Sequence, residues 1–306
     1  MMERTVLFIV NPISGSKIKK DRVIAGLEAK GCNIRFTEYA GHATVLAKEA
    51  QEDIVVAVGG DGTVNEVAKG LLGTDKVLGI LPCGSGDGLA MTLGISRHFE
   101  KAYRAIFNGD VHNLDWGTIN GREFFSVCGV GFDALVSEAF ALKGKRGLTT
   151  YIDSAIKEWI EFKPEHYSLN IDGQAIETDA AMITVANSTQ WGNGALVAPD
   201  ALTDDGLLDV TVIHPFHSLE IPHLAALLMT GRLGESDRVS FYRGKEILIH
   251  RSGPDAAHCD GDFIEEGADV TIRLGTEKLN VICPKPRARV SIEALRRHIS
   301  AKAGRH

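Results

Sequence analysis

Segments of strand length alternate with helical patterns along the first third of the chain. Strands are predicted over residues 5–10, 33–37, 54–58 and 77–81. Apolar residues at helical spacing predict helices over residues 19–30, 43–50 and 64–72. Continuous apolar strands separated by helices are typical of a parallel sheet with helices on its faces, so this part predicts an α/β domain.

The pattern changes near Gly121, after which strand signals and tight turns dominate. The pair Asp172-Gly173 lies between two strand segments and predicts a hairpin. Further strands are predicted over residues 210–213, 239–242, 247–249, 270–274 and 279–282. Helices are predicted over residues 151–162 and 219–231. The predicted division is an α/β domain over 1–122, a β-rich domain over 123–284 and a basic C-terminal segment over 285–306.

Composition narrows the class of protein. The chain has 306 residues with a hydrophobic fraction of 44%, which is enough for a large core, and no stretch approaches the ~20 apolar residues of a membrane span. The first apolar run ends at Asn11-Pro12 without a cleavage site for a signal peptide, so a cytoplasmic location is expected. Five cysteines without a CxxC pair indicate reduced thiols, neither a disulfide framework nor a zinc site.

Charge is unevenly distributed. The net charge of −7 argues against nucleic acid as a partner. From Pro284 to His306, however, there are seven Lys or Arg residues and one acid, Glu293. This segment either contacts anionic lipid or forms a solvated helix face, so peripheral contact with a membrane is left open.

A glycine turn with one acid stands between a predicted buried strand and a predicted helix. Its sequence is Gly59-Gly60-Asp61-Gly62-Thr63. Glycines allow a ligand to approach the backbone, and the N–H groups at a helix start favour phosphate. An acid beside phosphate groups fits two roles: it holds a bridging Mg²⁺, or it accepts a proton. The alternative is an ordinary turn with Asp61 at the helix start.

Several ordered motifs resemble the diacylglycerol kinase and sphingosine kinase superfamily. Residues 59–67, Gly-Gly-Asp-Gly-Thr-Val-Asn-Glu-Val, resemble the nucleotide signature of its catalytic domain. Three further motifs match in order: Asn-Pro-x-Ser-Gly at 11–15, a second glycine-rich loop at 82–86, and Asp-Gly-Asp at 260–262 in place of Asp-Gly-Glu. The segment 204–209, Asp-Asp-Gly-Leu-Leu-Asp, also fits. The resemblance implies a C-terminal β-sandwich after the α/β domain, an active site in the cleft between them, and a closing segment that packs back on the first domain.

The resemblance also implies ATP, Mg²⁺ and a set of site residues. Those expected around ATP are Asn11, Thr37, Gly60, Asp61, Gly62, Thr63, Val64, Asn65, Glu66, Gly84 and Ser85. Those expected at magnesium are Leu202, Asp205 and Leu207, with Asp115 nearby. The two leucines offer backbone carbonyl oxygens, which suit a hard cation. An ordinary turn between strands remains the alternative for this segment.

Two acids are candidates for the catalytic base. Asp262 matches the proton-accepting Glu of the bacterial lipid kinases but is one methylene shorter. In the sphingosine kinases, the corresponding role is assigned to the acid that matches Asp61. Both are kept, and Asp260-Gly261 also fits an ordinary hairpin turn.

The second glycine loop departs from the family pattern because Asp87 stands where Asn is usual. The added carboxylate would bind metal or a substrate amine, which favours a sphingoid or other polar-headed lipid over diacylglycerol, or it is a surface residue without such a role. For the lipid tail, the candidates are the helix with Trp159 and Phe162 and the segment 221–229, although apolar stripes are more often core.

The function predicted from these motifs is transfer of the γ-phosphoryl group of ATP to a lipid hydroxyl, with diacylglycerol, a sphingoid base or a related lipid as substrate. Two alternatives stay open: a kinase similar to NAD kinase, which shares Gly-Gly-Asp-Gly-Thr, and a non-catalytic module that binds lipid or nucleotide. Assembly as a homodimer is also left open.

Overall fold

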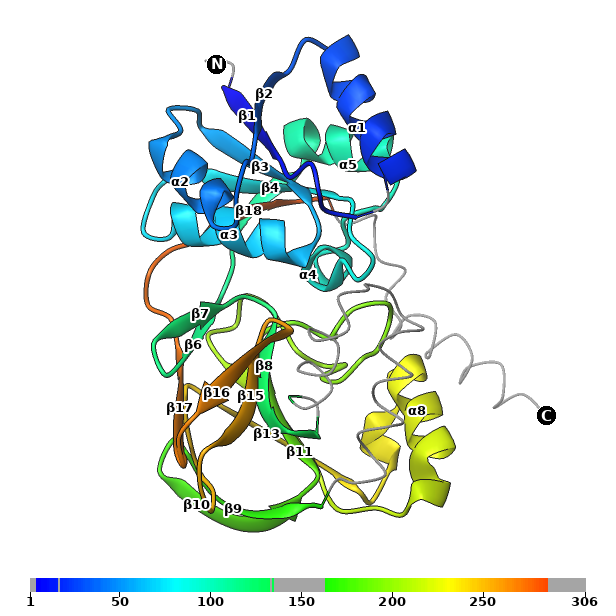
Figure 1. Ribbon diagram of the computed structural model, residues 1–306, viewed down its shortest axis with the longest axis vertical. Coiled ribbons are helices and arrows are strands. Elements are labelled where there is room, and N and C mark those ends of the chain that lie inside the picture. Colours follow the sequence, from blue (N-terminus) through cyan, green and yellow to red (C-terminus); the bar gives the residue numbers. More distant parts are fainter. Residues whose placement is uncertain (1–3, 16, 133, 135–162, 286–306) are drawn as a thin grey trace, which may run out of the picture.

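The computed structural model describes residues 4–15, 17–132, 134 and 163–285, which form two domains joined by two crossings of the chain (Figure 1). The predicted helix over 151–162 and most of the basic segment 285–306 lie outside the described residues. Among the described helices, none is both long and apolar enough to span a membrane.

The first domain is built on a six-stranded sheet in the order β2-β1-β3-β4-β18-β5. Its strands are β1 (Val6–Val10), β2 (Asn33–Phe36), β3 (Ile54–Gly59), β4 (Val77–Pro82), β5 (Asp110–Asn113) and β18 (Asn280–Cys283). All pairings are parallel except that of β5 with β18. Strands β3 and β4 are buried along their whole length, as their continuous apolar sequences predict.

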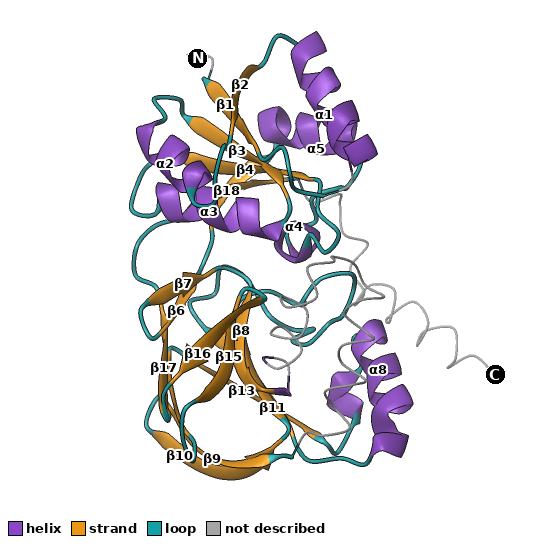
Figure 2. Cartoon of the chain, viewed as in Figure 1, coloured by secondary structure: helices purple, strands orange, loops and turns teal. Residues whose placement is uncertain are grey.

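Helices cover both faces of this sheet. They are α1 (Lys17–Ala29), α2 (His42–Glu49), α3 (Asp61–Leu71), α4 (Gly88–Thr92) and α5 (Phe99–Asn108). Figure 2 shows α1 and α5 on one face and α2 and α3 on the other. The predicted α/β fold with a parallel sheet is confirmed. This arrangement brings the loops after β1, β3 and β4 to the edge of the sheet that faces the second domain.

The second domain is a sandwich of two six-stranded sheets, ordered β10-β9-β14-β17-β6-β7 and β13-β12-β11-β8-β15-β16. The strands of the first sheet are β6 (Gly117–Ile119), β7 (Arg122–Phe124), β9 (Glu165–Ile171), β10 (Gln174–Ala180), β14 (Glu246–His250) and β17 (Asp269–Leu274). Those of the second sheet are β8 (Val127–Gly131), β11 (Met182–Ala186), β12 (Leu208–Ile213), β13 (Val239–Gly244), β15 (Asp255–Cys259) and β16 (Asp262–Glu266). Every pairing is antiparallel, and one apolar core lies between the sheets.

Helical turns flank the second sheet. These are η1 (Ser218–Glu220), α8 (Ile221–Thr230) and η2 (Leu233–Glu235), and together they account for the predicted helix over 219–231. Leu224 and Leu227 of α8 are buried, whereas Met229 is half exposed.

The sheets divide the chain differently from the predicted boundaries. Strands β6 and β7, at 117–124, pair in the sandwich, although the first domain was predicted to extend to 122. Strand β18, predicted inside the second domain, pairs in parallel with β4 of the first. An apolar run of four residues shows that a segment is a buried strand but does not identify its neighbour, which long-range pairing decides.

Candidate active site at the domain interface

The turn between β3 and α3 presents free backbone at the start of a helix. Gly60 precedes α3, and Asp61 is its first residue. A Cβ placed on Gly62 would meet no atom within 4 Å, so the backbone there faces open space. Because α3 has 11 residues and its first N–H groups point out of the helix, this turn suits the terminal phosphates of a nucleotide.

Three turns at the edge of the first sheet hold one another in place. The Ser14 hydroxyl accepts the N–H of Gly60 at 2.9 Å, while the Asn11 side chain accepts the N–H of Ile13 at 3.0 Å. A Cβ on Gly60 would lie 3.1 Å from the Cα of Gly84, so the first and second glycine loops touch. The motifs at 11–15, 59–63 and 82–86, separate in sequence, therefore form one surface.

The remaining predicted nucleotide residues have different settings. Thr37 is buried directly after β2, and its N–H donates to the carbonyl of Val10 at 2.9 Å. Glu66 accepts the N–H of Ala43 at 3.1 Å and thereby ties the start of α2 to α3. Ser85 is exposed, whereas Val64 belongs to the core.

Two buried side-chain oxygens near the glycine turn, Thr63 Oγ1 and Asn65 Oδ1, have no hydrogen-bond partner among the described residues. Buried polar atoms are normally paired, so such atoms at the start of a helix are open to a ligand or water. Together with the open backbone at Gly62, they fit a bound nucleotide.

Asp61 is held in a setting that disfavours its charge. The backbone N–H groups of Leu89 and Gly88 lower its pKa, but burial and the charges of Asp87 and Asp260 outweigh them. Burial is the largest cause, and the pKa is raised from 3.8 to about 6. An acid poised near neutrality in a loop surface is a candidate for proton transfer or for charge stabilisation.

Asp87 is neither a surface residue nor a free ligand. It is 2% exposed and takes a left-handed conformation with φ of 51°. Its carboxylate accepts the N–H of Gly84 at 2.8 Å and the Nε–H of Arg97 at 3.0 Å, and Lys19 Nζ lies 3.7 Å away. The acid is already neutralised, so neither a metal nor a substrate amine is needed to explain it.

The hairpin β15–β16 brings the late acidic motif toward the first domain. Asp260 and Gly261 form its two-residue turn, with φ of 50° and 85°, and the turn pairs Cys259 with Asp262. The Asp260 carboxylate accepts the backbone N–H groups of Phe125, Ser126 and Val127 at 2.8–3.0 Å. Asp260 and Gly261 therefore form a hairpin turn, and the Asp260 carboxylate in this turn is held in place by backbone hydrogen bonds.

This hairpin lies within electrostatic range of Asp61, since the charge of Asp260 contributes to the raised pKa of Asp61. Asp262 follows two residues later at the start of β16 and is exposed. The two candidate bases thus belong to motifs that meet across the domain interface, although Asp262 itself stays a prediction.

A second group of acids surrounds the predicted magnesium site. The N–H of Gly206 donates to Asp115 Oδ2 at 2.7 Å, and the N–H of Asp115 donates to the Thr203 carbonyl at 2.7 Å. The N–H of Leu207 donates to Asp205 Oδ1 at 3.2 Å. Burial raises the pKa of Asp115, as do the charges of Asp205 and Asp204. The loop that carries Leu202 to Leu207 therefore wraps around Asp115.

Arg243 competes with a cation in this group. It pairs with Asp205 Oδ2, and its Nε lies 3.0 Å from Asp209 Oδ1. Within the described residues, no cluster of three or more His, Cys, Asp or Glu side chains has the arrangement of a metal site. The oxygen donors suit Mg²⁺ chemically, but they include two carboxylates at most, and one of them is paired with arginine.

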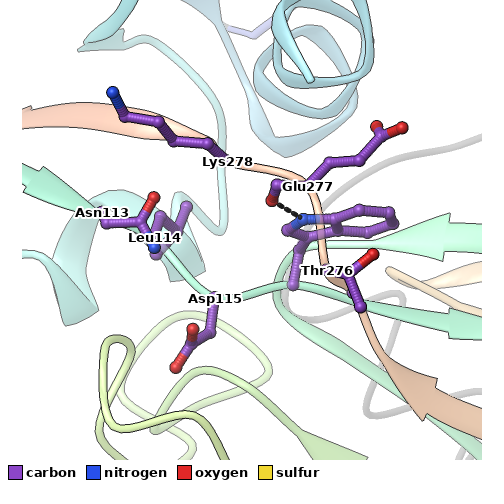
Figure 3. A pocket seen from close by; sticks show the side chains of 8 residues that line it. Asn113, Leu114, Asp115, Thr276, Glu277 and Lys278 are labelled. Atoms are coloured by element: carbon purple, nitrogen blue, oxygen red, sulfur yellow. Dashed lines mark hydrogen bonds between the residues drawn. The ribbon is translucent and has the colours of Figure 1, made fainter. Parts of the chain in front are cut away.

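Asp115 also borders a pocket of about 290 Å³ where the two interdomain segments cross (Figure 3). The Trp116 indole N–H donates to the Glu277 carbonyl at 2.8 Å, and the N–H of Leu114 donates to the Leu279 carbonyl at 2.7 Å. A Cβ on Gly275 would meet the Trp116 ring at 2.2 Å. These contacts fix one crossing against the other and so set the relative placement of the domains.

The loop 187–194 of the second domain belongs to the same interface but was not singled out in the sequence. The N–H of Asn193 donates to the Gly86 carbonyl at 3.4 Å, and the Thr189 hydroxyl lies 3.0 Å from that of Thr92. A Cβ on Gly88 would meet the Gly192 backbone at 3.3 Å. The available signal was Gly192-Asn193-Gly194 beside a tryptophan, which indicates a turn but not its partner.

Comparisons with known proteins agree with this arrangement. Residues 5–119 match the diacylglycerol kinase catalytic domain, and residues 126–283 match the YegS C-terminal NAD kinase beta sandwich-like domain. A relative named diacylglycerol kinase from Mycobacterium tuberculosis (strain CDC 1551) is 30% identical over 276 residues, which cover 84% of this chain and 88% of the relative.

Solved structures share the fold. The crystal structure of a diacylglycerol kinase from Bacillus anthracis str. Sterne has a TM-score of 0.72 at 22% identity and covers 93% of this chain and 98% of its own. An NAD kinase from Archaeoglobus fulgidus, solved in complex with ATP, has a TM-score of 0.54 at 12% identity and covers 95% and 99%. Both likenesses concern the fold, including the predicted β-sandwich, which is confirmed.

Proposed function

Because the chain belongs to the diacylglycerol kinase family, we propose that it transfers the γ-phosphoryl group of ATP to the hydroxyl group of a lipid. The relatives establish a kinase; ATP as donor and lipid as acceptor are the proposal. The observation that carries it is the setting of Asp61: a carboxylate with a raised pKa, at the start of α3, between a phosphate-binding turn and an acidic hairpin of the second domain.

ATP fits the first-domain surface. The open backbone at Gly62 and the start of α3 suit the β- and γ-phosphates, and the buried Thr63 Oγ1 and Asn65 Oδ1 beside them have no hydrogen-bond partner among the described residues. Asn11, Gly60, Gly84 and exposed Ser85 border the same surface. The NAD kinase that shares this fold was solved with ATP.

Magnesium would neutralise the charge of the phosphates when it is bound. Asp115 and Asp205, with the carbonyl groups of Leu202 and Leu207, are the residues proposed to hold it. Binding there requires Arg243 to give up its contact with Asp205, because one carboxylate oxygen does not serve both cations equally well.

The transfer step needs one proton acceptor. The lipid oxygen attacks the γ-phosphorus while its proton passes to a carboxylate, and the bond from the γ-phosphorus to the bridging oxygen breaks, so that ADP leaves. Asp262 is exposed on the hairpin that faces Asp61, which supports it as the base. Asp61 remains the alternative, since its pKa of about 6 also suits proton transfer.

Diacylglycerol is the acceptor we propose first, because the relative with 30% identity carries that name. The argument from Asp87 for a sphingoid amine is withdrawn, since Arg97 and Gly84 already occupy its carboxylate.

The test is transfer of radiolabelled phosphate from ATP, with Mg²⁺, to a panel of acceptors: diacylglycerol, monoacylglycerol, ceramide, a sphingoid base, phosphatidylglycerol and NAD. We expect a labelled lipid product and none from NAD. Labelling of NAD alone would favour the kinase similar to NAD kinase. Nucleotide binding without transfer to any acceptor would favour a non-catalytic module.

A further inference from the structure

The second glycine loop, residues 84–88, lies against two aspartates, Asp87 and Asp61. Asp87 accepts the N–H of Gly84 at 2.8 Å, and the backbone N–H groups of Gly88 and Leu89 lower the pKa of Asp61. A Cβ on Gly86 would meet Asp61 Oδ2 at 3.1 Å, so the loop rests directly against this carboxylate. A shift of the loop therefore changes the surroundings of Asp61.

Arg97 binds the loop from the opposite side. Its Nη2 donates to the carbonyls of Ser85 at 2.8 Å and Gly86 at 2.6 Å, and its Nε donates to Asp87 Oδ2 at 3.0 Å. One guanidinium thus holds three consecutive residues, a geometry that a lysine cannot reproduce. Because the carbonyl oxygens of Ser85 and Gly86 bond to Arg97, they do not point at a bound phosphate and do not repel its negative charge.

The second domain fixes the third side of the loop. The Gly86 carbonyl also accepts the N–H of Asn193 at 3.4 Å, and Gly88 packs on the backbone of Gly192. The position of the loop therefore depends on contacts from Asp61, from Arg97 and from the other domain.

We propose that Arg97 and Asp87 are positioning residues for phosphoryl transfer: the ion pair between the exposed Arg97 guanidinium and the buried Asp87 carboxylate holds the second glycine loop, so that Ser85 faces the nucleotide and Asp61 keeps its orientation. The inference rests on the proposed function and adds residues to its site. Asp87 departs from the usual Asn of the family loop, and the arginine is the partner that makes this change tolerable.

Removing one partner has a different consequence from removing both. The Asp87 carboxylate is 2% exposed in the presence of Arg97, and without Arg97 the remaining cationic group beside it among the described contacts is Lys19, with Nζ at 3.7 Å. A buried charge that loses its partner is strongly unfavourable, so the loop is expected to move. Asn at position 87 carries no charge, yet its Oδ1 still accepts the N–H of Gly84, so the loop tolerates the loss of Arg97 better.

The experiment compares Arg97→Gln, Asp87→Asn and the double variant with the wild type. We expect Arg97→Gln to lower kcat/KM for ATP by about 10- to 100-fold, as loss of charge-assisted hydrogen bonds implies. The double variant is expected to recover at least about threefold of that loss, because neighbouring sites in one network are non-additive. Arg22→Gln is the matched control: Arg22 lines the cavity beside Arg97 and is exposed, and we expect it to act as the wild type.

Thermal unfolding of every variant separates positioning from folding. Equal kcat and KM in Arg97→Gln and wild type, or a fall in Tm without a kinetic change, overturns the inference, as does a double variant worse than Arg97→Gln. If Arg97→Gln does not fold, Arg97→Lys replaces it; a wild-type KM for ATP in that variant also overturns the inference.

The same variants distinguish this inference from the proposed function. If the wild type transfers phosphate to no lipid, the proposed function fails. Calorimetric ATP affinity then still tests the positioning role of Arg97 and Asp87, because unchanged affinity in Arg97→Gln overturns that role. If the wild type is active, the kinetic comparison tests the positioning role of Arg97 and Asp87 independently of the proposed function.

Discussion

Two groups of acids occupy the domain interface, and they neutralise their charge in different ways. Around Asp61, the acids accept backbone N–H groups, and Asp87 also pairs with Arg97. Around Asp115, a loop from the second domain supplies N–H groups while Arg243 pairs with Asp205 and Asp209. In both groups, burial raises the pKa of the central acid.

The difference lies in what remains available. Arg97 pairs with Asp87 and leaves Asp61 at the nucleotide surface without a cationic side chain bonded to it among the described contacts. Arg243 instead takes Asp205, one of the proposed magnesium ligands. In the proposed function, the first group therefore needs no exchange of partners, whereas the second must exchange an arginine for a metal.

The largest expected effect is that of Asp61→Asn, which breaks the first group. We expect transfer to fall toward the upper end of about 10²–10⁴-fold, because the amide neither accepts a proton nor stabilises positive charge. Since burial disfavours the charged carboxylate, the variant should unfold at the same or a higher temperature at pH 7.

Steady-state kinetics measures the rate of transfer, and calorimetry measures the unfolding temperature. Asp75→Asn, at an exposed acid that pairs with Lys278, is the control; near-normal turnover of Asp61→Asn would falsify its role.

Asp262→Ala tests which acid is the base. We expect kcat to fall by about 10²-fold or more while ATP affinity stays unchanged, because the proposed role of Asp262, which lies in the second domain, is to take the proton of the acceptor. Calorimetric titration with ATP and a kcat measurement separate these effects, with Glu265→Ala, on the same strand and exposed, as control. Loss of ATP binding with an intact fold, or an unchanged kcat, would assign the role to Asp61.

The pH dependence of kcat/KM reports on Asp61. Its pKa of about 6 means that the carboxylate becomes protonated as the pH falls below about 6, so activity should decline about tenfold per pH unit there. In the unfolded chain the group titrates near 3.8, so the folded state binds the proton more tightly. Its contribution to stability is thus greatest below pH 4 and is lost as the pH rises through about 6. A flat profile between pH 5 and 7 contradicts the assignment.

The smallest expected effect concerns the second group. Arg243→Gln removes the cation that competes for Asp205, so the Mg²⁺ concentration for half-maximal activity should fall several-fold. A magnesium titration of activity measures it, and Arg273→Gln, which breaks an exposed pair with Glu246, is the control. If Arg243→Gln requires more Mg²⁺, or the same amount, this loop is not the magnesium site that limits activity.

Sequence reasoning reached the first domain more completely than the second. Continuous apolar strands and amphipathic helices recur at short range, and each of β1, β3 and β4 was predicted within a residue or two. In the sandwich, β8 and β11 were missed although both are buried along their length. Short strands of an antiparallel fold depend on partners far along the chain, which no local pattern specifies.

The candidate site shows the same limit. The glycine turn, Asp61 and the late Asp-Gly-Asp motif could be predicted because their chemistry is written in consecutive residues. Arg97 could not, since it stands ten residues after Asp87 in a segment without a motif. The role of Asp260, which accepts three N–H groups from 125–127, also needed the pairing of β15 with β8.

By itself, the sequence determined the α/β domain and the β-rich domain and indicated the residues proposed to bind phosphate, because these follow from local periodicity and from the chemistry of adjacent side chains. Only the tertiary structure decided that β18 returns to the first sheet, that Asp87 is buried against Arg97, and that Asp260 lies near Asp61. These depend on which distant segments pack together, and packing sets both the burial that shifts a pKa and the partner that neutralises a charge.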